Sequence, residues 1–206
     1  MHKIDQKLKA KMEKATNEVK GFLPSPEKLN KEQITKIIQR YAASIEGNFL
    51  SWMGGASISC RSVLSKFAVD ENLWVEIKDN HPGMLRKFAK DCKAEPNSED
   101  YRYTEKETNE VREIVAELSG IKTITLMATL ENTSSAFIPF LAQLGKKLGC
   151  KDFTYTDVHG EADIEHADQF LEALTDEQNL GYQNAEKEVD DTIKITLVLL
   201  KKIFTI

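Results

Sequence analysis

The sequence has few helix-breaking residues and no long apolar run. It contains only 10 glycines and 5 prolines among 206 residues. Strands are hard to place, because no stretch bounded by turn residues alternates strictly between apolar and polar side chains. No segment approaches the roughly 20 apolar residues of a membrane span, and the charged start, MHKIDQKLKAKMEK, lacks the apolar segment of a secretory signal. We therefore expect an all-α, cytoplasmic protein with no membrane partner.

Cysteine is also scarce. Cys60, Cys92 and Cys150 are widely spaced, and no two of them form a CxxC pair. An odd number at such spacing indicates neither a disulfide framework nor a thiolate zinc site. Because unpaired cysteine is among the most frequently buried residue types, we predict three reduced and mostly buried thiols.

A basic surface is missing as well. Lys and Arg together number 28 against 33 Asp and Glu, which gives a net charge of -5. The basic residues are scattered through the chain, whereas a nucleic-acid-binding protein gathers them into a patch or stripe that meets the phosphates. The sequence therefore argues against a nucleic-acid partner.

The apolar residues that are present recur at helical spacing. Asn30 stands three residues before Gln33, a capping-box pattern that predicts the start of a helix with one buried, isoleucine-rich face. Pro82 predicts a helix break directly after His81, because the residue before proline disfavours helical geometry.

A second boundary is predicted at Thr104. We expect residues 93–104 to form a long loop, with Thr104 and Glu107 as the capping box of the next helix. The whole chain is expected to be one helical domain, with a basic helix and linker in residues 1–27. Residues 28–206 then form a core bundle, and the chain has about seven helices in all.

Three polar residues lie where the helix expected at residues 152–175 should be apolar. At about 100° per residue, Asp163 and His166 fall within about 40° of His159, on the same face as Phe170. Burying these groups without compensation costs several kcal/mol. A metal ion would compensate them, because imidazole and carboxylate groups converge on one face. An internal hydrogen-bonded His-Asp-His cluster explains this helix equally well.

Two further segments also place ionisable residues where apolar side chains are expected. Glu131 is the only charged residue in a nearly all-apolar stretch, residues 123–145, and is predicted to be buried. Glu76 lies on an apolar helix face, and His81 follows at the break. Each of these residues also has a simpler explanation when it is taken alone. Glu131 could form a buried ion pair with Lys or Arg, and His81 could be a helix cap or a surface residue.

Together these groups suggest a metal centre. They supply three nitrogen and three oxygen donors, a set that suits one or two Fe(II) or Mn(II) ions in a helical bundle. The set has too much carboxylate for structural zinc, and three imidazoles disfavour Mg(II). The candidate ligands are Glu76, His81, Glu131, His159, Asp163 and His166.

The spacing of these residues resembles that of the haem-oxygenase-like diiron oxidases and oxygenases. The resemblance is carried by the pattern His159-x3-Asp163-x2-His166, by the NLxxE...HP run at residues 72–82 and by a lone Glu in a central apolar helix. The stretches LNKEQITKIIQRYAASIEGNF and HGEADIEHADQFLEAL are similar to helices of the branch that contributes steps toward para-aminobenzoate. The likeness covers about residues 28–175.

The resemblance implies a haem-oxygenase-like helical bundle, which is often a homodimer. It also implies that the six candidate ligands hold two irons, of which the second is often bound loosely. Such enzymes use O2 and electrons from a donor to oxidise a small bound substrate. Tyr155 matches a tyrosine one turn before the first histidine, where it would face the substrate or pass an electron or proton. Two departures are the short Glu76–His81 spacing and Leu130, which replaces a tyrosine of the para-aminobenzoate branch. The substrate is therefore either external or a tyrosine of the chain itself.

Two other functions are compatible with the sequence. A metal-free enzyme like the thiaminase-type relatives would use a cysteine such as Cys60 with a carboxylate. A non-catalytic helical binding protein would present the apolar last helix, residues 193–204, to a partner, although core packing explains that helix more simply.

Overall fold

The computed structural model describes residues 4–206, apart from the side chains of residues 161–165. Within this part of the chain there are nine α-helices, one short 3₁₀ helix and no strand, which confirms the all-α expectation. In chain order the elements are α1 (Gln6–Phe22), η1 (Pro26–Lys28), α2 (Lys31–Ile45), α3 (Phe49–Ser59), α4 (Val63–Lys78), α5 (His81–Asp91), α6 (Ser98–Ala116), α7 (Gly120–Leu148), α8 (Thr154–Gln178) and α9 (Ala185–Phe204).

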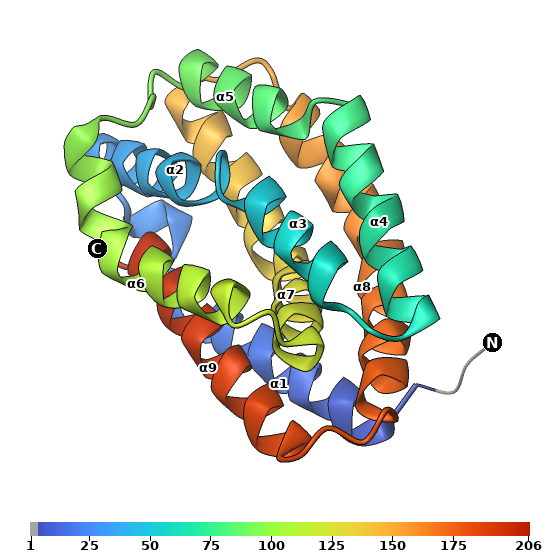
Figure 1. Ribbon diagram of the computed structural model, residues 1–206. Helices are drawn as coiled ribbons and strands as arrows, with labels where there is room; N and C mark the ends of the chain where they lie inside the picture. Colours follow the sequence, from blue (N-terminus) through green and yellow to red (C-terminus); the bar gives the residue numbers. More distant parts are fainter. Residues whose placement is uncertain (1–3) are drawn as a thin grey trace.

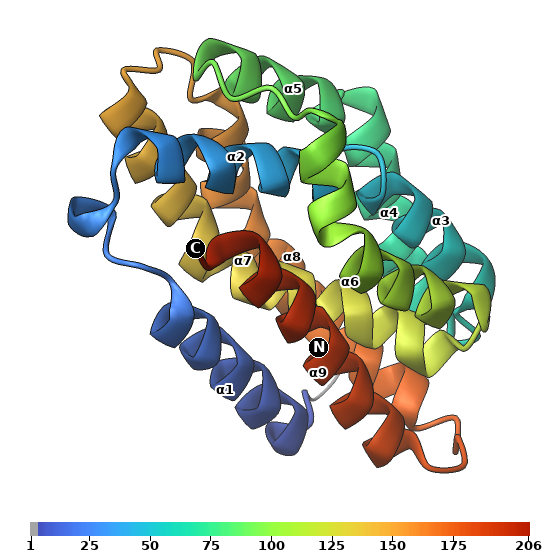
Figure 2. The same ribbon diagram turned by 90° about the vertical axis from the view of Figure 1, so that its left-hand side faces the viewer.

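Helix α7 passes through the middle of the bundle, and α8 lies beside it (Figure 1). Helix α7 also packs against α1, α2, α3, α6 and α9, so it has neighbours on every side. This position follows from its sequence, because a helix that is apolar nearly all round must be covered all round. Ile124, Leu126 and Met127 are fully buried. Helix α5 lies across one end of the bundle, at the top of both views (Figure 2).

The predicted start of α2 is confirmed. The Asn30 side chain accepts a hydrogen bond from the Gln33 backbone N–H at 2.9 Å, and the Gln33 side chain accepts one from the Asn30 N–H at 3.0 Å. However, the helix ends at Ile45, and α3 begins only at Phe49. A turn that contains Gly47 separates them, and such breaks raise the number of α-helices above the expected seven.

The predicted cap at Thr104 and Glu107 is wrong. The cap of helix α6 lies seven residues earlier, where Asn97 and Asp100 form a capping box of the same kind. Thr104 lies inside the helix, buried, and its hydroxyl accepts a hydrogen bond from Ser44 at 2.9 Å. The two capping patterns are chemically similar, and the packing of α6 against its neighbours, mainly α2 and α9, favours the earlier one.

A helix break close to Pro82 is confirmed, but it lies before His81 and not directly after it. Helix α4 ends at Lys78, and Asn80 adopts the left-handed conformation, with φ at 55°, before α5 begins at His81. Gly83 lies against the Asn80 side chain, where a Cβ atom would approach Asn80 Nδ2 to 2.3 Å. A larger residue there would displace the turn.

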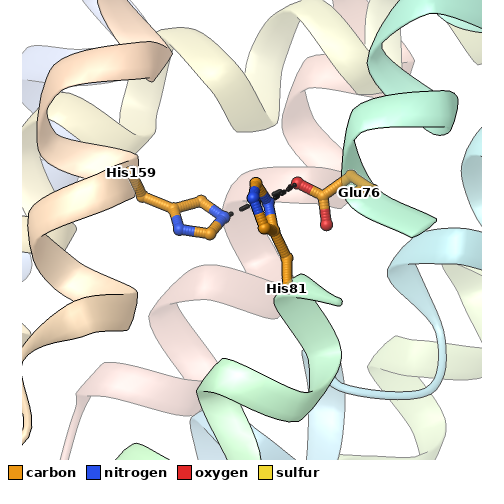
Figure 3. Close-up of side chains that lie close together, drawn as sticks. All are labelled: Glu76, His81 and His159. Carbon is orange, nitrogen blue, oxygen red and sulfur yellow. Dashed lines mark hydrogen bonds and ion pairs between the residues drawn. The ribbon is translucent and has the colours of Figure 1, made fainter. Parts of the chain in front are cut away.

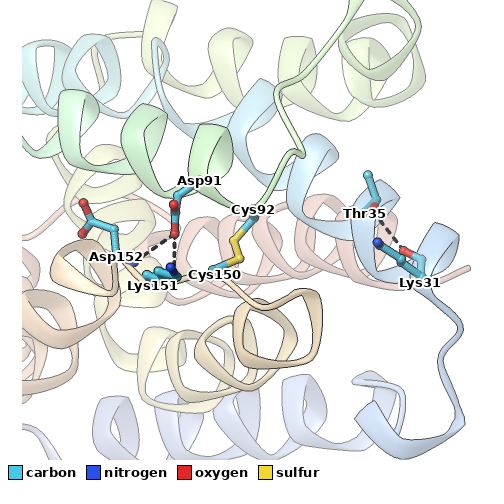
Figure 4. Close-up of a disulfide and its surroundings, with 7 residues drawn as sticks. All are labelled: Lys31, Thr35, Asp91, Cys92, Cys150, Lys151 and Asp152. Carbon is cyan, nitrogen blue, oxygen red and sulfur yellow. Dashed lines mark hydrogen bonds between the residues drawn. A yellow bond between two sulfur atoms is a disulfide. The ribbon is translucent and has the colours of Figure 1, made fainter.

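The prediction of three reduced thiols requires a correction. Cys92 and Cys150 form a disulfide across 58 residues of sequence, with their Cα atoms 4.9 Å apart (Figure 4). Their spacing hides this pairing, because only the folded bundle brings the end of α5 to the residues before α8. Cys60 is buried and free, as predicted.

No helix within residues 4–206 combines the length and apolar character that a membrane crossing requires. The apolar side of α9 faces inward, with Leu199, Leu200, Ile203 and Phe204 all buried. Packing therefore accounts for the apolar sequence of this last helix.

Candidate metal centre

Three of the candidate ligands meet in the interior, each from a different helix. Glu76 lies near the end of α4, His81 begins α5, and His159 belongs to α8 (Figure 3). Oε1 of Glu76 is 2.7 Å from Nδ1 of His81 and 3.6 Å from Nε2 of His159. One ligand atom from each residue lies within 4.8 Å of the others. These three ligand atoms could therefore bind a single metal ion after a small movement of the side chains toward one another.

Hydrogen bonds fix which ring nitrogen of His159 is protonated. Its Nδ1 lies 2.8 Å from the backbone oxygen of Tyr155. A carbonyl oxygen only accepts, so Nδ1–H is the donor, and Nε2 is the nitrogen that faces Glu76. Two facing lone pairs would repel, so a proton, a water molecule or a metal ion between Nε2 and the carboxylate would stabilise this arrangement. An imidazole held by a backbone carbonyl in this way is a common support for a metal ligand.

The same reasoning applies to His81. Its Nδ1 donates to Glu76, which leaves Nε2 available to a cation. The rings of His81 and His159 meet edge to face with centroids 4.7 Å apart. The two imidazoles thus lie together beside the Glu76 carboxylate.

Glu76 is a carboxylate at neutral pH. Burial by itself raises its pKa, but hydrogen bonds from His159 and His81, together with their charges, outweigh that effect and lower the pKa to about 2. Only 8% of the residue is exposed. A buried, ionised carboxylate between two imidazoles is chemically suited to a divalent cation.

A second pair lies nearby. Glu131 of α7 is buried, as predicted, and its Oε2 is 3.9 Å from Nδ1 of His166 on α8. Asp163, the remaining candidate, lies outside the residues whose side chains the structure describes. Five candidates are therefore placed, three in one cluster and two in a neighbouring pair.

One cavity joins the two groups. It has a volume of about 50 Å³, and four candidate ligands line it: Glu76, His81, Glu131 and His159. The other walls are mainly apolar and come from α2, α3, α5, α7 and α8. At about 10–15 Å³ per water-sized guest, such a space holds only a few small molecules.

Two tyrosines also line this cavity. The hydroxyls of Tyr41 and Tyr155 are 2.7 Å apart and buried, and the Tyr155 ring lies over His159 with centroids 4.3 Å apart. The position of Tyr155 on the His159 face is as predicted. The hydrogen bond between Tyr155 and Tyr41 was missed, because the two tyrosines lie 114 residues apart in the sequence.

A helical bundle with a buried set of carboxylates and imidazoles is an architecture that di-iron carboxylate proteins use. Residues 38–190 match the model of a family described as iron-containing redox enzymes, and the chain belongs to this family. The matched range includes every candidate ligand. Neither a curated protein nor a solved structure matches the chain.

Proposed function

We propose that the chain is a non-haem, O2-activating oxidoreductase with two iron ions that acts on a small organic substrate. The observation that carries this proposal is the buried cluster of Glu76, His81 and His159, which shares one cavity with Glu131. Manganese is the alternative metal, because this donor set suits either ion. The proposed ligands are Glu76, His81, Glu131, His159, Asp163 and His166.

The arrangement in two groups supports two ions. Glu76, His81 and His159 form one group, and Glu131 with His166 forms the start of another. Asp163 lies on α8 between the two histidines and is the proposed sixth ligand. Three carboxylates against two divalent cations leave one net positive charge, which favours an anionic ligand in the cavity.

The protein's own part is to position, to exclude water and to move protons. Bound iron would supply the redox chemistry with O2. The remaining walls of the cavity are mainly apolar, which disfavours water beside the site. The buried hydroxyls of Tyr155 and Tyr41 share a hydrogen bond beside the cavity, and Tyr155, whose ring covers His159, would pass a proton or an electron.

The substrate proposed is a small organic molecule, with electrons from an external donor. The resemblance to the para-aminobenzoate branch suggests a step in that kind of cofactor biosynthesis. The cavity volume of about 50 Å³ suits O2 itself, so a larger substrate must widen the cavity when it binds.

Anaerobic titration with Fe(II) tests this proposal. We expect iron binding by the wild-type protein and its loss in the double variant Asp163→Ala plus His166→Ala, while the helical circular dichroism spectrum persists. Asp157→Ala plus Asp168→Ala, which removes two exposed carboxylates of the same helix, is the matched control and should bind iron normally. Equal binding by both double variants would contradict the ligand assignment.

The two other functions considered for this sequence find less support. Burial, followed by the charge of Glu177, raises the pKa of Cys60 to about 12, so this thiol is not a ready nucleophile. Glu177 is itself occupied, because it accepts hydrogen bonds from the backbone N–H groups of Arg61 and Ser62. A binding surface on α9 is disfavoured because its apolar side packs inward.

A further inference from the structure

Helix α5 and the beginning of α8 form an antiparallel pair with different chemistry at each end. At one end Cys92, which follows α5, is bonded to Cys150, which precedes α8. At the other end His81, the first residue of α5, meets His159. The disulfide therefore closes the same helix pair that brings these two candidate ligands together.

The disulfide end is held by polar contacts as well. Asp91 Oδ2 accepts hydrogen bonds from the backbone N–H groups of Lys151 and Asp152, the latter at 3.0 Å (Figure 4). Lys87 Nζ is 2.6 Å from the Asp152 carboxylate. These contacts lie at the surface, where water and salt weaken them. The disulfide is thus the only covalent tie between α5 and the segment before α8.

A row of rings runs from the middle of α5 to the histidine end of the pair. Phe88, in the middle of α5, lies 6.4 Å from the ring of Phe153 and 6.4 Å from that of Tyr155. Tyr155 in turn covers His159. Because packed side chains transmit displacement, a change in the separation of α5 and α8 at the disulfide reaches the imidazoles.

We propose that Cys92 and Cys150 are positioning residues for the metal centre, and that their oxidation state sets how well His81 and His159 share one ion. A dithiol reductant would open the bond by thiol–disulfide exchange. The reductant gives up two electrons and two protons and becomes a disulfide itself. The bond between Cys92 and Cys150 takes them up and becomes two cysteine thiols. The reducing cytoplasm expected for this chain would favour the open form. The inference rests on the proposed function for the identity of the site.

The first test uses no metal. The imidazole nitrogen resonances of His81 and His159 are recorded by NMR before and after reduction with a dithiol. We expect them to shift on reduction in the wild-type protein and in Cys60→Ser, the matched control. In Cys92→Ser plus Cys150→Ser they should be insensitive to the reductant. A disulfide that only stabilises the fold would lower the melting temperature on opening and leave these resonances in place, which would overturn the proposal.

The second test measures affinity for Co(II) under anaerobic conditions. We expect the reduced wild-type protein to bind about tenfold more weakly than the oxidised one, the scale typical of lost support around a ligand. Equal affinities would overturn the proposal. Failure of both forms to bind any metal would instead contradict the proposed function, and the imidazole resonances would still decide the positioning role.

A thiol count provides the last check. The oxidised protein, denatured without reductant, should show one free thiol, that of Cys60, and three after reduction. Three thiols before reduction, in protein purified under air, would mean that the bond does not form and would overturn the proposal.

Discussion

Oε1 of Glu76 accepts a hydrogen bond from Nδ1 of His81 at 2.7 Å, across the break between α4 and α5. Only four residues separate the two in sequence, fewer than is usual in the family that the motif resembles. The short spacing suffices because Asn80 turns the chain in the left-handed conformation. The break in the helix is therefore part of the site, since it aims the imidazole back at the carboxylate one turn before it.

Replacing Glu76 with glutamine should weaken metal binding by at least about tenfold, because the neutral amide loses the negative charge that attracts a cation, while its oxygen can still accept the hydrogen bond from His81. The fold should persist, since the amide has nearly the same shape. Isothermal titration with Co(II) or Mn(II) measures the effect. Glu71→Gln, on the exposed side of the same helix, is the control and should bind like wild type. Unchanged affinity in Glu76→Gln would remove this residue from the site.

Replacing Tyr155 with phenylalanine should leave iron binding intact and slow the reaction of the ferrous protein with O2 by about 10²-fold, the scale of a lost proton-transfer group. Stopped-flow absorbance after mixing with O2 measures the rate. Tyr101→Phe changes an exposed tyrosine and should have no effect. A normal rate in Tyr155→Phe would reduce this residue to a packing role.

Cys60 should resist alkylation in the folded protein. Its pKa of about 12 keeps the thiol protonated at pH 8, because the thiolate forms only as the pH rises toward that value. Mass spectrometry after treatment with iodoacetamide should show no label on Cys60 until the protein is denatured. Rapid labelling of the native protein, or loss of activity in Cys60→Ala, would revive the cysteine-based alternative.

Glu177 should contribute to the stability of the folded protein and not to metal affinity. Its buried carboxylate accepts hydrogen bonds from the N–H groups of Arg61 and Ser62 and from the Tyr182 hydroxyl, which ties the end of α8 to the start of α4. Glu177→Ala leaves these donors unsatisfied and should cost at least ~2 kcal/mol in urea unfolding. Metal affinity of the folded fraction should stay near that of wild type. A selective loss of affinity would link this tie to the site.

Local chemistry made much of the site predictable. Glu131 stood out as the only charged residue in the apolar stretch of residues 123–145, and a buried carboxylate was the direct consequence. The 3.6-residue period placed Tyr155 and His159 on one face. These features depend on neighbours within a few turns, which the sequence displays.

The features that sequence reasoning missed depend on contacts between distant segments. The pairing of Cys92 with Cys150 and the hydrogen bond from Tyr41 to Tyr155 span 58 and 114 residues. The start of α6 was misplaced because two capping patterns compete, and tertiary packing chooses between them. The local spacing of these residues does not show which cysteines and tyrosines pair or which cap begins the helix.

The most direct measurement is anomalous scattering at the iron absorption edge from crystals loaded with excess Fe(II) without oxygen. We predict an iron peak between the carboxylate of Glu76 and the imidazoles of His81 and His159, with a second, weaker peak beside Glu131 and His166. Iron peaks only elsewhere on the protein, with none at this cluster despite saturating Fe(II), would contradict the proposal that these side chains converge to hold metal.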